Sequence, residues 1–141
     1  MQGYTRTIHY YETDQMKVVH HSNYIRWFEE ARIYYFNASN MSYPDLEALG
    51  VVSPVVEIEC NYKAMMHFSE EAQIEVQFYK CTGISYQVAY QIYRKSDQTL
   101  CCTGRSKHCF VTSTGKIVNL KRQYPEIFEM LKNMEEEPLT K

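Results

Sequence analysis

The second half of the chain constrains the fold most, because it alternates polar and apolar residues over several short segments. Residues 72–80 and 84–94 place apolar side chains at every second position, which is typical of strands with one buried face. Residues 51–62 and 99–112 are also predicted as strands. The turn-forming residues 95–98 predict a hairpin. Because tight turns join antiparallel strands, the segments predict an antiparallel sheet.

The first half of the chain supplies a strand and a long helix. Residues 3–11 are predicted as a strand that an irregular connection joins to a helix over 22–37. Either Ser22 or Asn23 is expected to cap that helix through a side-chain oxygen. A short helical piece is predicted over 44–50. The residues expected on one face of the long helix recur at helical spacing; they are Tyr24, Ile25, Phe28, Ala31, Arg32 and Tyr35.

One face of an antiparallel sheet needs an apolar cover. The 22–37 helix is the only early element long enough to provide it. We therefore predict one α+β domain over residues 1–141, in which a curved antiparallel sheet wraps around one central helix. Residues 117–120 form a short extension after the last strand, and an amphipathic C-terminal helix is expected over about 124–136. The open sheet edges suggest pairing with a second copy.

Composition excludes several classes of protein. The 141 residues carry a net charge of -2 and no block of Lys or Arg, which argues against a nucleic-acid partner. No apolar stretch approaches the ~18 residues of a membrane span, and the N-terminus lacks the apolar region of a signal peptide. The five cysteines include no C-x-x-C pair, so we expect free thiols, no structural metal and a cytoplasmic location.

Titratable residues gather in the connection that precedes the long helix. Asp14 follows the first strand and His21 precedes the helix. A helix N-terminus offers unpaired N–H groups that can polarise a carbonyl, and a nearby carboxylate can act as nucleophile or general base. The same residues also fit plainer roles, because Asp14 can cap a turn and His20 and His21 can be surface or core histidines. A zinc site built from Asp14, His20 and His21 is a further alternative.

The same connection carries a recognisable motif. The pattern T-D-x-x-G-V-V-x-H-x-x-Y, followed by E-x-x-R on a helix, appears as Thr13-Asp14, Val18-Val19, His21, Asn23-Tyr24, and Glu29 with Arg32. Residues 10–36 thus resemble the hotdog-fold acyl-CoA thioesterases of the 4-hydroxybenzoyl-CoA thioesterase branch, which includes the Tol-Pal-associated acyl-CoA thioesterases. The strand order over 51–120 is similar as well.

The resemblance implies a role for each matching residue. Asp14 corresponds to the family's catalytic aspartate, and His21 to the helix-entry position whose N–H polarises the thioester carbonyl. Tyr10 corresponds to a tyrosine implicated in some members. Ser22 at the helix start is expected near the developing oxyanion, and Asn23 and Tyr24 are expected to brace the helix start and line the acyl pocket.

The resemblance also implies partners and shows departures from the pattern. The family pairs its sheets and binds coenzyme A across the seam, so we expect a homodimer or tetramer. Coenzyme A is part of the substrate, and no separate cofactor is expected. Lys17 replaces the family glycine, and Ala64-Met65 replaces a common Pro-Ala. Basic residues that could hold the phosphates stay unassigned; the candidates are Lys63, Lys80, Arg105 and Lys107.

The expected function is hydrolysis of a small acyl-CoA to the free acid and coenzyme A. The alternative is a non-catalytic module that binds acyl-CoA or lipid, in which Asp14 is only a turn cap. A hydratase or dehydratase activity is disfavoured, because such hotdog relatives place a histidine on the central helix and this helix has none.

Overall fold

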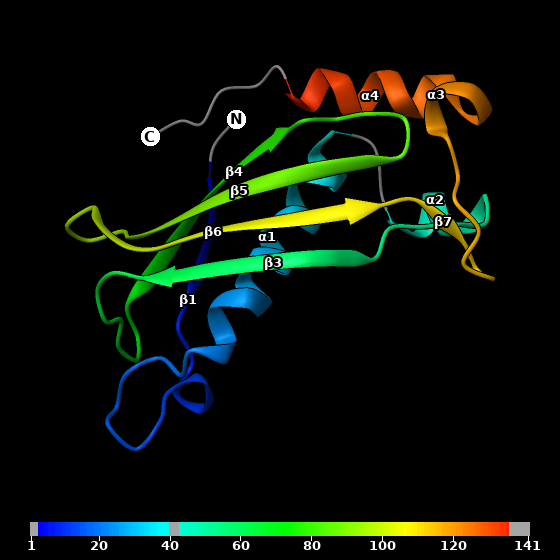
Figure 1. Cartoon of the computed structure of the whole chain (residues 1–141). Coiled ribbons are helices and arrows are strands. Elements are labelled where there is room, and N and C mark those ends of the chain that lie inside the picture. The colour runs from blue at the N-terminus through cyan, green and yellow to red at the C-terminus, as the bar shows by residue number, and fades with distance from the viewer. Residues whose placement is uncertain (1–2, 40–42, 136–141) are drawn as a thin grey trace.

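The computed structural model describes residues 3–39 and 43–135, and one long helix crosses a five-stranded antiparallel sheet in it (Figure 1). The strand order is β1-β4-β5-β6-β3. The long helix α1 spans Ser22–Ala38. The sheet strands are β1 (Tyr4–Thr7), β3 (Val55–Tyr62), β4 (Glu71–Tyr79), β5 (Ser85–Arg94) and β6 (Thr99–Cys109).

The remaining elements are short and lie around this frame. A two-stranded sheet joins β2 and β7, and a 3-10 turn, η1, follows β1. Their bounds are η1 (Tyr10–Glu12), α2 (Tyr43–Ala48), β2 (Val51–Val52), β7 (Val111–Thr112), α3 (Leu120–Gln123) and α4 (Pro125–Glu135). In the described part of the chain, no helix has the length and apolar character needed to cross a membrane.

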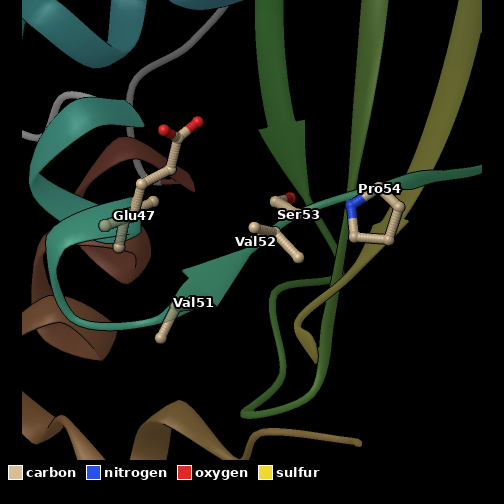
Figure 2. A pocket seen from close by; sticks show the side chains of 6 residues that line it. Glu47, Val51, Val52, Ser53 and Pro54 are labelled. Atoms are coloured by element: carbon tan, nitrogen blue, oxygen red, sulfur yellow. The ribbon is translucent and has the colours of Figure 1, made fainter. Parts of the chain in front are cut away.

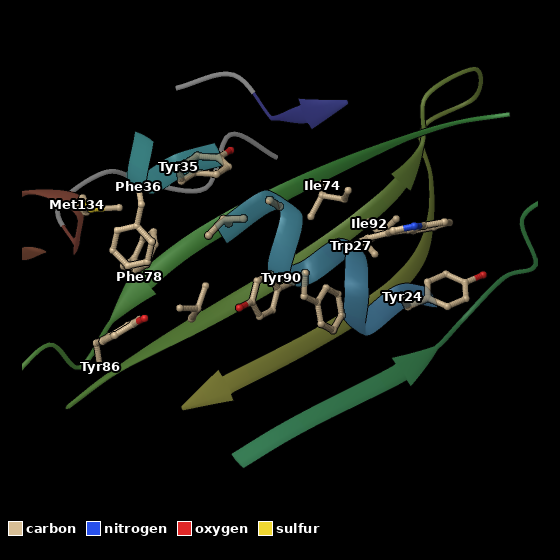
Figure 3. Packing of buried hydrophobic residues seen from close by; sticks show 14 of the residues in the cluster. Tyr24, Trp27, Tyr35, Phe36, Ile74, Phe78, Tyr86, Tyr90, Ile92 and Met134 are labelled. Atoms are coloured by element: carbon tan, nitrogen blue, oxygen red, sulfur yellow. The ribbon is translucent and has the colours of Figure 1, made fainter. Parts of the chain in front are cut away.

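The core lies between α1 and the sheet (Figure 3). Alternate residues of the central strands point toward the helix and are buried, as the alternation predicts; they include Ile74, Val76, Phe78, Tyr86, Val88, Tyr90 and Ile92. The helix buries Tyr24, Trp27, Phe28, Ala31, Tyr35 and Phe36 against them. The α+β fold with one central helix is therefore confirmed. Ile25, predicted on the buried face, is instead 39% exposed.

A glycine allows α1 to approach the sheet closely. The rings of Phe28 and Tyr90 stack with 4.2 Å between centroids. Gly104 of β6 is directly opposite Tyr90 on the neighbouring strand, and a Cβ at position 104 would sit 2.4 Å from the Phe28 ring. The contact therefore requires a residue without a side chain at position 104.

Buried polar side chains also join the helix to the sheet. Arg32 donates a hydrogen bond of 2.9 Å to the Tyr90 hydroxyl, which lies 2.7 Å from the Ser106 hydroxyl. Ser106 in turn lies 2.7 Å from Nε2 of His108. Burial and the charge of Arg32 lower the pKa of His108 to about 3, so its imidazole is neutral. The interactions satisfy the polar atoms that they join, whereas Nδ1 of His108 is buried without a hydrogen-bond partner among the described residues.

Several predicted boundaries are corrected by the structure. The first strand ends at Thr7 instead of residue 11, because residues 10–12 turn into η1. The predicted strand 51–62 is divided at Pro54, whose nitrogen has no hydrogen to donate to a ladder. The predicted strand 99–112 is likewise divided, at Phe110.

The two predicted helices that follow the long helix are confirmed. The short helix is observed as α2, and Gly50 follows it with a φ of 80°, which suits a glycine at a helix end. The C-terminal helix is observed as α4, and residue 136 of the predicted range lies outside the described residues. Residues 117–120 contribute only a bridge from Ile117 to Val111 before α3 begins.

Candidate active site

A pocket of about 360 Å³ opens at the N-terminal end of α1. Two segments that are distant in sequence form it: the connection before α1 together with the first turn of α1, and the chain at the end of β3. The lining residues are Asp14, Val18, Val19, His21, Tyr24, Tyr62, Lys63, Ala64 and Met65. The fold thus brings together Asp14, His21 and Tyr24 from the predicted site.

Asp14 sits in a tight turn and is half-buried. Its Oδ1 accepts a hydrogen bond of 2.8 Å from the Met16 N–H, and its carbonyl accepts one of 2.9 Å from the Lys17 N–H. Within residues 3–39 and 43–135, Oδ2 has no hydrogen-bond or ion-pair partner. One carboxylate oxygen therefore caps the turn, and the other is available on a residue that lines the pocket.

Lys17 gives this turn its shape. Its φ is 67°, in the left-handed region that glycine adopts most easily. Lysine therefore takes a left-handed conformation at the position where the family pattern has glycine, at a cost of about 1–2 kcal/mol. The turn after Asp14 therefore forms without a glycine at position 17.

His21 occupies the N-cap position of α1, and its N–H has no acceptor among the described residues. The Tyr62 hydroxyl donates a hydrogen bond of 3.1 Å to the His21 carbonyl. The exposed imidazole stacks on His20 with 4.3 Å between centroids. A residue that lines the pocket therefore has an available backbone N–H at the positive end of a 17-residue helix.

Ser22 and Asn23 make other contacts than those predicted. The N-cap residue His21 makes no side-chain cap, so the expected capping by Ser22 or Asn23 is wrong. The Ser22 hydroxyl lies 2.9 Å from Nδ1 of His20, and the amide of Asn23 donates 2.8 Å to the Glu12 carbonyl. Asn23 therefore braces the helix start, as predicted. Neither residue lines the pocket, and their contact with substrate stays a prediction.

Tyr24 forms the inner wall of the pocket. Its side chain is buried at one end of α1 (Figure 3), and its ring lies 5.2 Å from that of Trp27 and 5.3 Å from that of Tyr62. Burial raises the pKa of Tyr24, so the phenol is neutral near pH 7. Tyr24 thus offers an apolar ring to the pocket.

Tyr10 lies apart from this pocket. Its side chain is 71% exposed on η1, and its ring makes an edge contact with Phe68 at 5.6 Å between centroids. The Tyr10 carbonyl accepts hydrogen bonds from the Thr13 N–H and hydroxyl, at 3.1 and 2.7 Å. Its backbone supports the Asp14 turn, whereas its ring is not among the pocket residues.

Glu12 is the residue of this region that the motif did not single out. It is 5% exposed, and its Oε1 accepts hydrogen bonds from Arg6 at 2.9 Å and from the His9 N–H at 2.8 Å. Its Oε2 accepts one of 2.9 Å from the Trp27 indole. Burial alone would raise the pKa of Glu12, but the hydrogen bonds, led by that from Arg6, lower it. Glu12 thereby fixes η1 between β1 and α1.

A second pocket of about 220 Å³ lies beside α2 and β2 (Figure 2). It is lined by Leu46, Glu47, Val51, Val52, Ser53 and Pro54. None of the predicted site residues belongs to it. Within the described ranges, no three His, Cys, Asp or Glu side chains group closely enough to hold a metal ion.

Comparison with known proteins places this geometry in a family. The model of the thioesterase-like superfamily matches residues 8–134. The chain belongs to this superfamily. It is accordingly a thioester hydrolase, and the curved sheet around α1 is the hotdog fold of that superfamily. The match covers every residue of the predicted site.

Individual relatives agree with this membership. The Bacillus subtilis (strain 168) protein named "Putative acyl-CoA thioesterase YneP" is 30% identical over 119 residues, 84% of this chain and 86% of the relative. The solved DHNA-CoA thioesterase from Staphylococcus aureus is 29% identical, with a TM-score of 0.88 over 94% of this chain and 89% of that one. A hypothetical protein from Aquifex aeolicus is 27% identical, with a TM-score of 0.82 over 91% and 97%.

The basic residues considered for coenzyme A are spread over the thioesterase. Lys63 lines the pocket. Lys80 follows β4 with a φ of 50°, in the turn toward β5. Arg105 of β6 makes ion pairs with Glu57 at 3.5 Å and Glu59 at 3.6 Å. Lys107 lies on the same strand, directly opposite Glu57. Of the four, only Lys63 is at the site.

Proposed function

We propose that this thioesterase hydrolyses an acyl-CoA with Asp14 as nucleophile or general base and the His21 N–H as the donor to the developing oxyanion. The observation that carries the proposal is that Asp14 and His21 line one pocket at the start of α1. The unpaired Oδ2 supplies the reactive carboxylate oxygen. The free N–H at the helix start supplies the electrostatic stabilisation.

The chemistry requires few catalytic groups. A thioester has less resonance stabilisation than an oxygen ester, so its carbonyl carbon reacts readily with a carboxylate or with an activated water. One preorganised donor is worth about 2.7–4 kcal/mol in acyl transfer, and holding the substrate in position supplies several more. Coenzyme A leaves as the thiol, and the acid is released, so no separate cofactor takes part.

The proposed substrate has a compact acyl group, either a short aliphatic chain or an aromatic ring. A pocket of about 360 Å³ is near the lower end of the ligand-site range of roughly 300–1,000 Å³. The rings of Tyr24 and Tyr62 form two of its walls and suit an apolar or aromatic group. Lys63 is the cation placed to meet a phosphate of coenzyme A. Within the superfamily, we propose that the protein belongs to the 4-hydroxybenzoyl-CoA thioesterase branch, which includes the Tol-Pal-associated acyl-CoA thioesterases.

We also propose that two copies pair along β3. This eight-residue strand is the last of the sheet order, and among the described strands it pairs only with β6. Val55, Val56 and Ile58 are exposed along it, and a long apolar edge of this kind favours pairing with another strand. Pairing there would place the end of β3, and so Tyr62, near the seam. Light scattering tests this arrangement: a mass of two chains would support the dimer, and a mass of four chains would indicate a tetramer of such dimers.

The decisive experiment compares Asp14→Asn with a matched control, Asp97→Asn. Both carboxylates cap a turn by accepting a hydrogen bond from the N–H two residues ahead, Met16 for Asp14 and Thr99 for Asp97. Only Asp14 lines the pocket. Against a panel of aliphatic and aromatic acyl-CoAs, Asp14→Asn should lower kcat by at least a hundredfold, and Asp97→Asn should keep it within about twofold.

The same panel separates the enzyme from a binding module. Tight binding of an acyl-CoA by the unmodified protein, without release of acid, would favour the non-catalytic alternative. Normal turnover in Asp14→Asn, with the fold intact by circular dichroism, would remove Asp14 from the mechanism. The family-level activity would then require another residue.

A further inference from the structure

Two thiols lie in contact behind the wall of the active-site pocket. Sγ of Cys60 on β3 is 3.4 Å from Sγ of Cys102 on β6. Cys60 is half-buried, whereas Cys102 is completely buried. The pair joins an outer thiol that small molecules can reach to an inner thiol that they cannot.

The strand register explains why the sulfur atoms meet. Cys60 is directly opposite Gly104, and Cys102 is directly opposite Tyr62. The two cysteines are therefore diagonal neighbours on the face of the sheet that points to α1. Because Gly104 has no side chain, the Cys60 side chain can lean along the strand toward Cys102.

The contact makes the outer thiol reactive. The hydrogen bond between the two thiols lowers the pKa of Cys60, against the opposing effect of burial. The same interaction, together with burial, raises the pKa of Cys102. Thiolates attack disulfides and thiols do not. Because Cys60 is half-buried and Cys102 is completely buried, Cys60 is the thiol that a small disulfide can reach, and Cys102 reacts only afterwards.

We propose that Cys60 and Cys102 form a reversible dithiol–disulfide couple driven by low-molecular-weight disulfides. The Cys60 thiolate attacks one sulfur of the small disulfide, forms a mixed disulfide and releases one thiolate. Cys102 then gives up its proton and attacks the Cys60 sulfur, which forms the protein disulfide and releases the second thiolate. Two protein thiols are oxidised, and one small disulfide is reduced to two thiols.

Closing this bond must move the edge strand. A disulfide needs an S–S distance of about 2.05 Å and Cα atoms no more than about 7 Å apart, whereas diagonal neighbours across a pair of strands lie about 7–8 Å apart. Among the described strands of one copy, β3 pairs only with β6, so β3 and a strand of a second copy paired with it can shift toward β6 together. A bond under such strain is easily reduced again, which suits the reducing compartment expected from the sequence.

The shift would reach the site through Tyr62. This residue is two positions beyond Cys60 on β3, donates its hydrogen bond to the His21 carbonyl and contacts the Tyr24 ring. Pulling β3 toward β6 would change that hydrogen bond and the pocket wall. The disulfide is thus expected to lower thioester hydrolysis, and this consequence rests on the proposed function.

The experiment treats the reduced protein with oxidised glutathione and maps its cysteines by differential alkylation and peptide mass spectrometry. The unmodified protein should yield a Cys60–Cys102 cross-linked peptide that dithiothreitol removes. Cys102→Ser should instead trap the intermediate as a stable glutathione adduct on Cys60, and Cys60→Ser should leave Cys102 unmodified. The matched control is Cys109→Ser, which removes the half-buried cysteine at the end of β6 and should keep the cross-link.

The peptide mapping tests the dithiol–disulfide couple independently of which thioester the protein hydrolyses. A lasting glutathione adduct on Cys60 in the unmodified protein, or no modification of Cys60, would overturn the proposal. Hydrolysis is then measured as the loss of thioester absorbance, because a reagent that detects the released thiol would also react with Cys60. A cross-linked protein should be at least fivefold slower and should recover on reduction, and unchanged hydrolysis after complete cross-linking would overturn the link to the site.

Discussion

The Tyr62 hydroxyl donates a hydrogen bond of 3.1 Å to the backbone carbonyl of His21. This bond joins the end of the edge strand β3 to the residue that begins α1. It therefore holds the pocket wall against the helix start, where the His21 N–H is available to a substrate. The position of this donor depends on contacts between segments that are 41 residues apart.

Removing the hydroxyl of Tyr62 should loosen the helix start. We expect Tyr62→Phe to lower kcat about three- to thirtyfold, because the proposed donor loses its fixed position. The loss in free energy of unfolding should stay near 1 kcal/mol, since one partly exposed hydrogen bond is removed. Steady-state kinetics and urea unfolding measure the two effects. A variant with unchanged kcat would show that this bond does not position the donor.

The stability of the fold should depend strongly on the buried carboxylate of Glu12. Glu12→Gln breaks a buried ion pair with Arg6 at 2.9 Å, but Arg6 keeps its pair with Glu30, so we expect a loss of about 1.5–3 kcal/mol in the free energy of unfolding. Glu30→Gln is the matched control, because Glu30 also pairs with Arg6 at 2.9 Å but is 40% exposed. Its loss should be below about 1 kcal/mol. Equal losses in the two variants would show that burial does not set the strength of these pairs.

The same residue predicts how stability depends on pH. The pKa of Glu12 is lowered in the folded protein, so the folded state binds its proton less readily than the unfolded state does. Its contribution is fully present above the unfolded pKa of about 4.3 and is lost as pH falls through the lower folded pKa. Urea unfolding between pH 3 and pH 7 should show this fall in the unmodified protein. The fall should be smaller in Glu12→Gln, and identical slopes would contradict the assignment.

Gly104 should tolerate no side chain while Phe28 is present. In Gly104→Ala the new Cβ would lie 2.4 Å from the Phe28 ring and 2.8 Å from the Glu59 carbonyl oxygen, and we expect a loss of about 1–3 kcal/mol. Phe28→Leu should recover part of this loss in the double variant, which a thermodynamic cycle of urea unfolding measures. Strictly additive losses would show that the ring is not the source of the clash.

Lys17 should be replaceable by the family glycine. Lys17→Gly relieves a left-handed residue at φ 67°, but it also makes the unfolded chain more flexible, so we expect a gain of at most about 1 kcal/mol. Lys17→Val should instead lose about 1–2 kcal/mol, because a β-branched residue fits this conformation poorly. Thermal unfolding compares the two variants. A glycine variant less stable than the valine variant would exclude strain at this position.

Periodicity and local chemistry determined the main elements of this protein. The alternation along β4 and β5 specifies which side chains face the helix, and the apolar spacing of α1 specifies the face that covers them. The connection from Asp14 to His21 could be recognised because its motif lies within a few residues of one helix start. These features depend on neighbours in the sequence, and so they can be read from it.

Tertiary structure decided what distant residues do to one another. The sequence does not show that β3 pairs with β6 and leaves β4 to pair with β1 and β5, nor that this brings Tyr62 to His21 and Cys60 to Cys102. It also does not show that Glu12 is buried beneath Arg6 and Trp27 while Tyr10 faces solvent, because burial depends on which surfaces pack together. Local pattern fixes which face of an element is apolar, but contacts across strands and between layers arise only when the chain is folded.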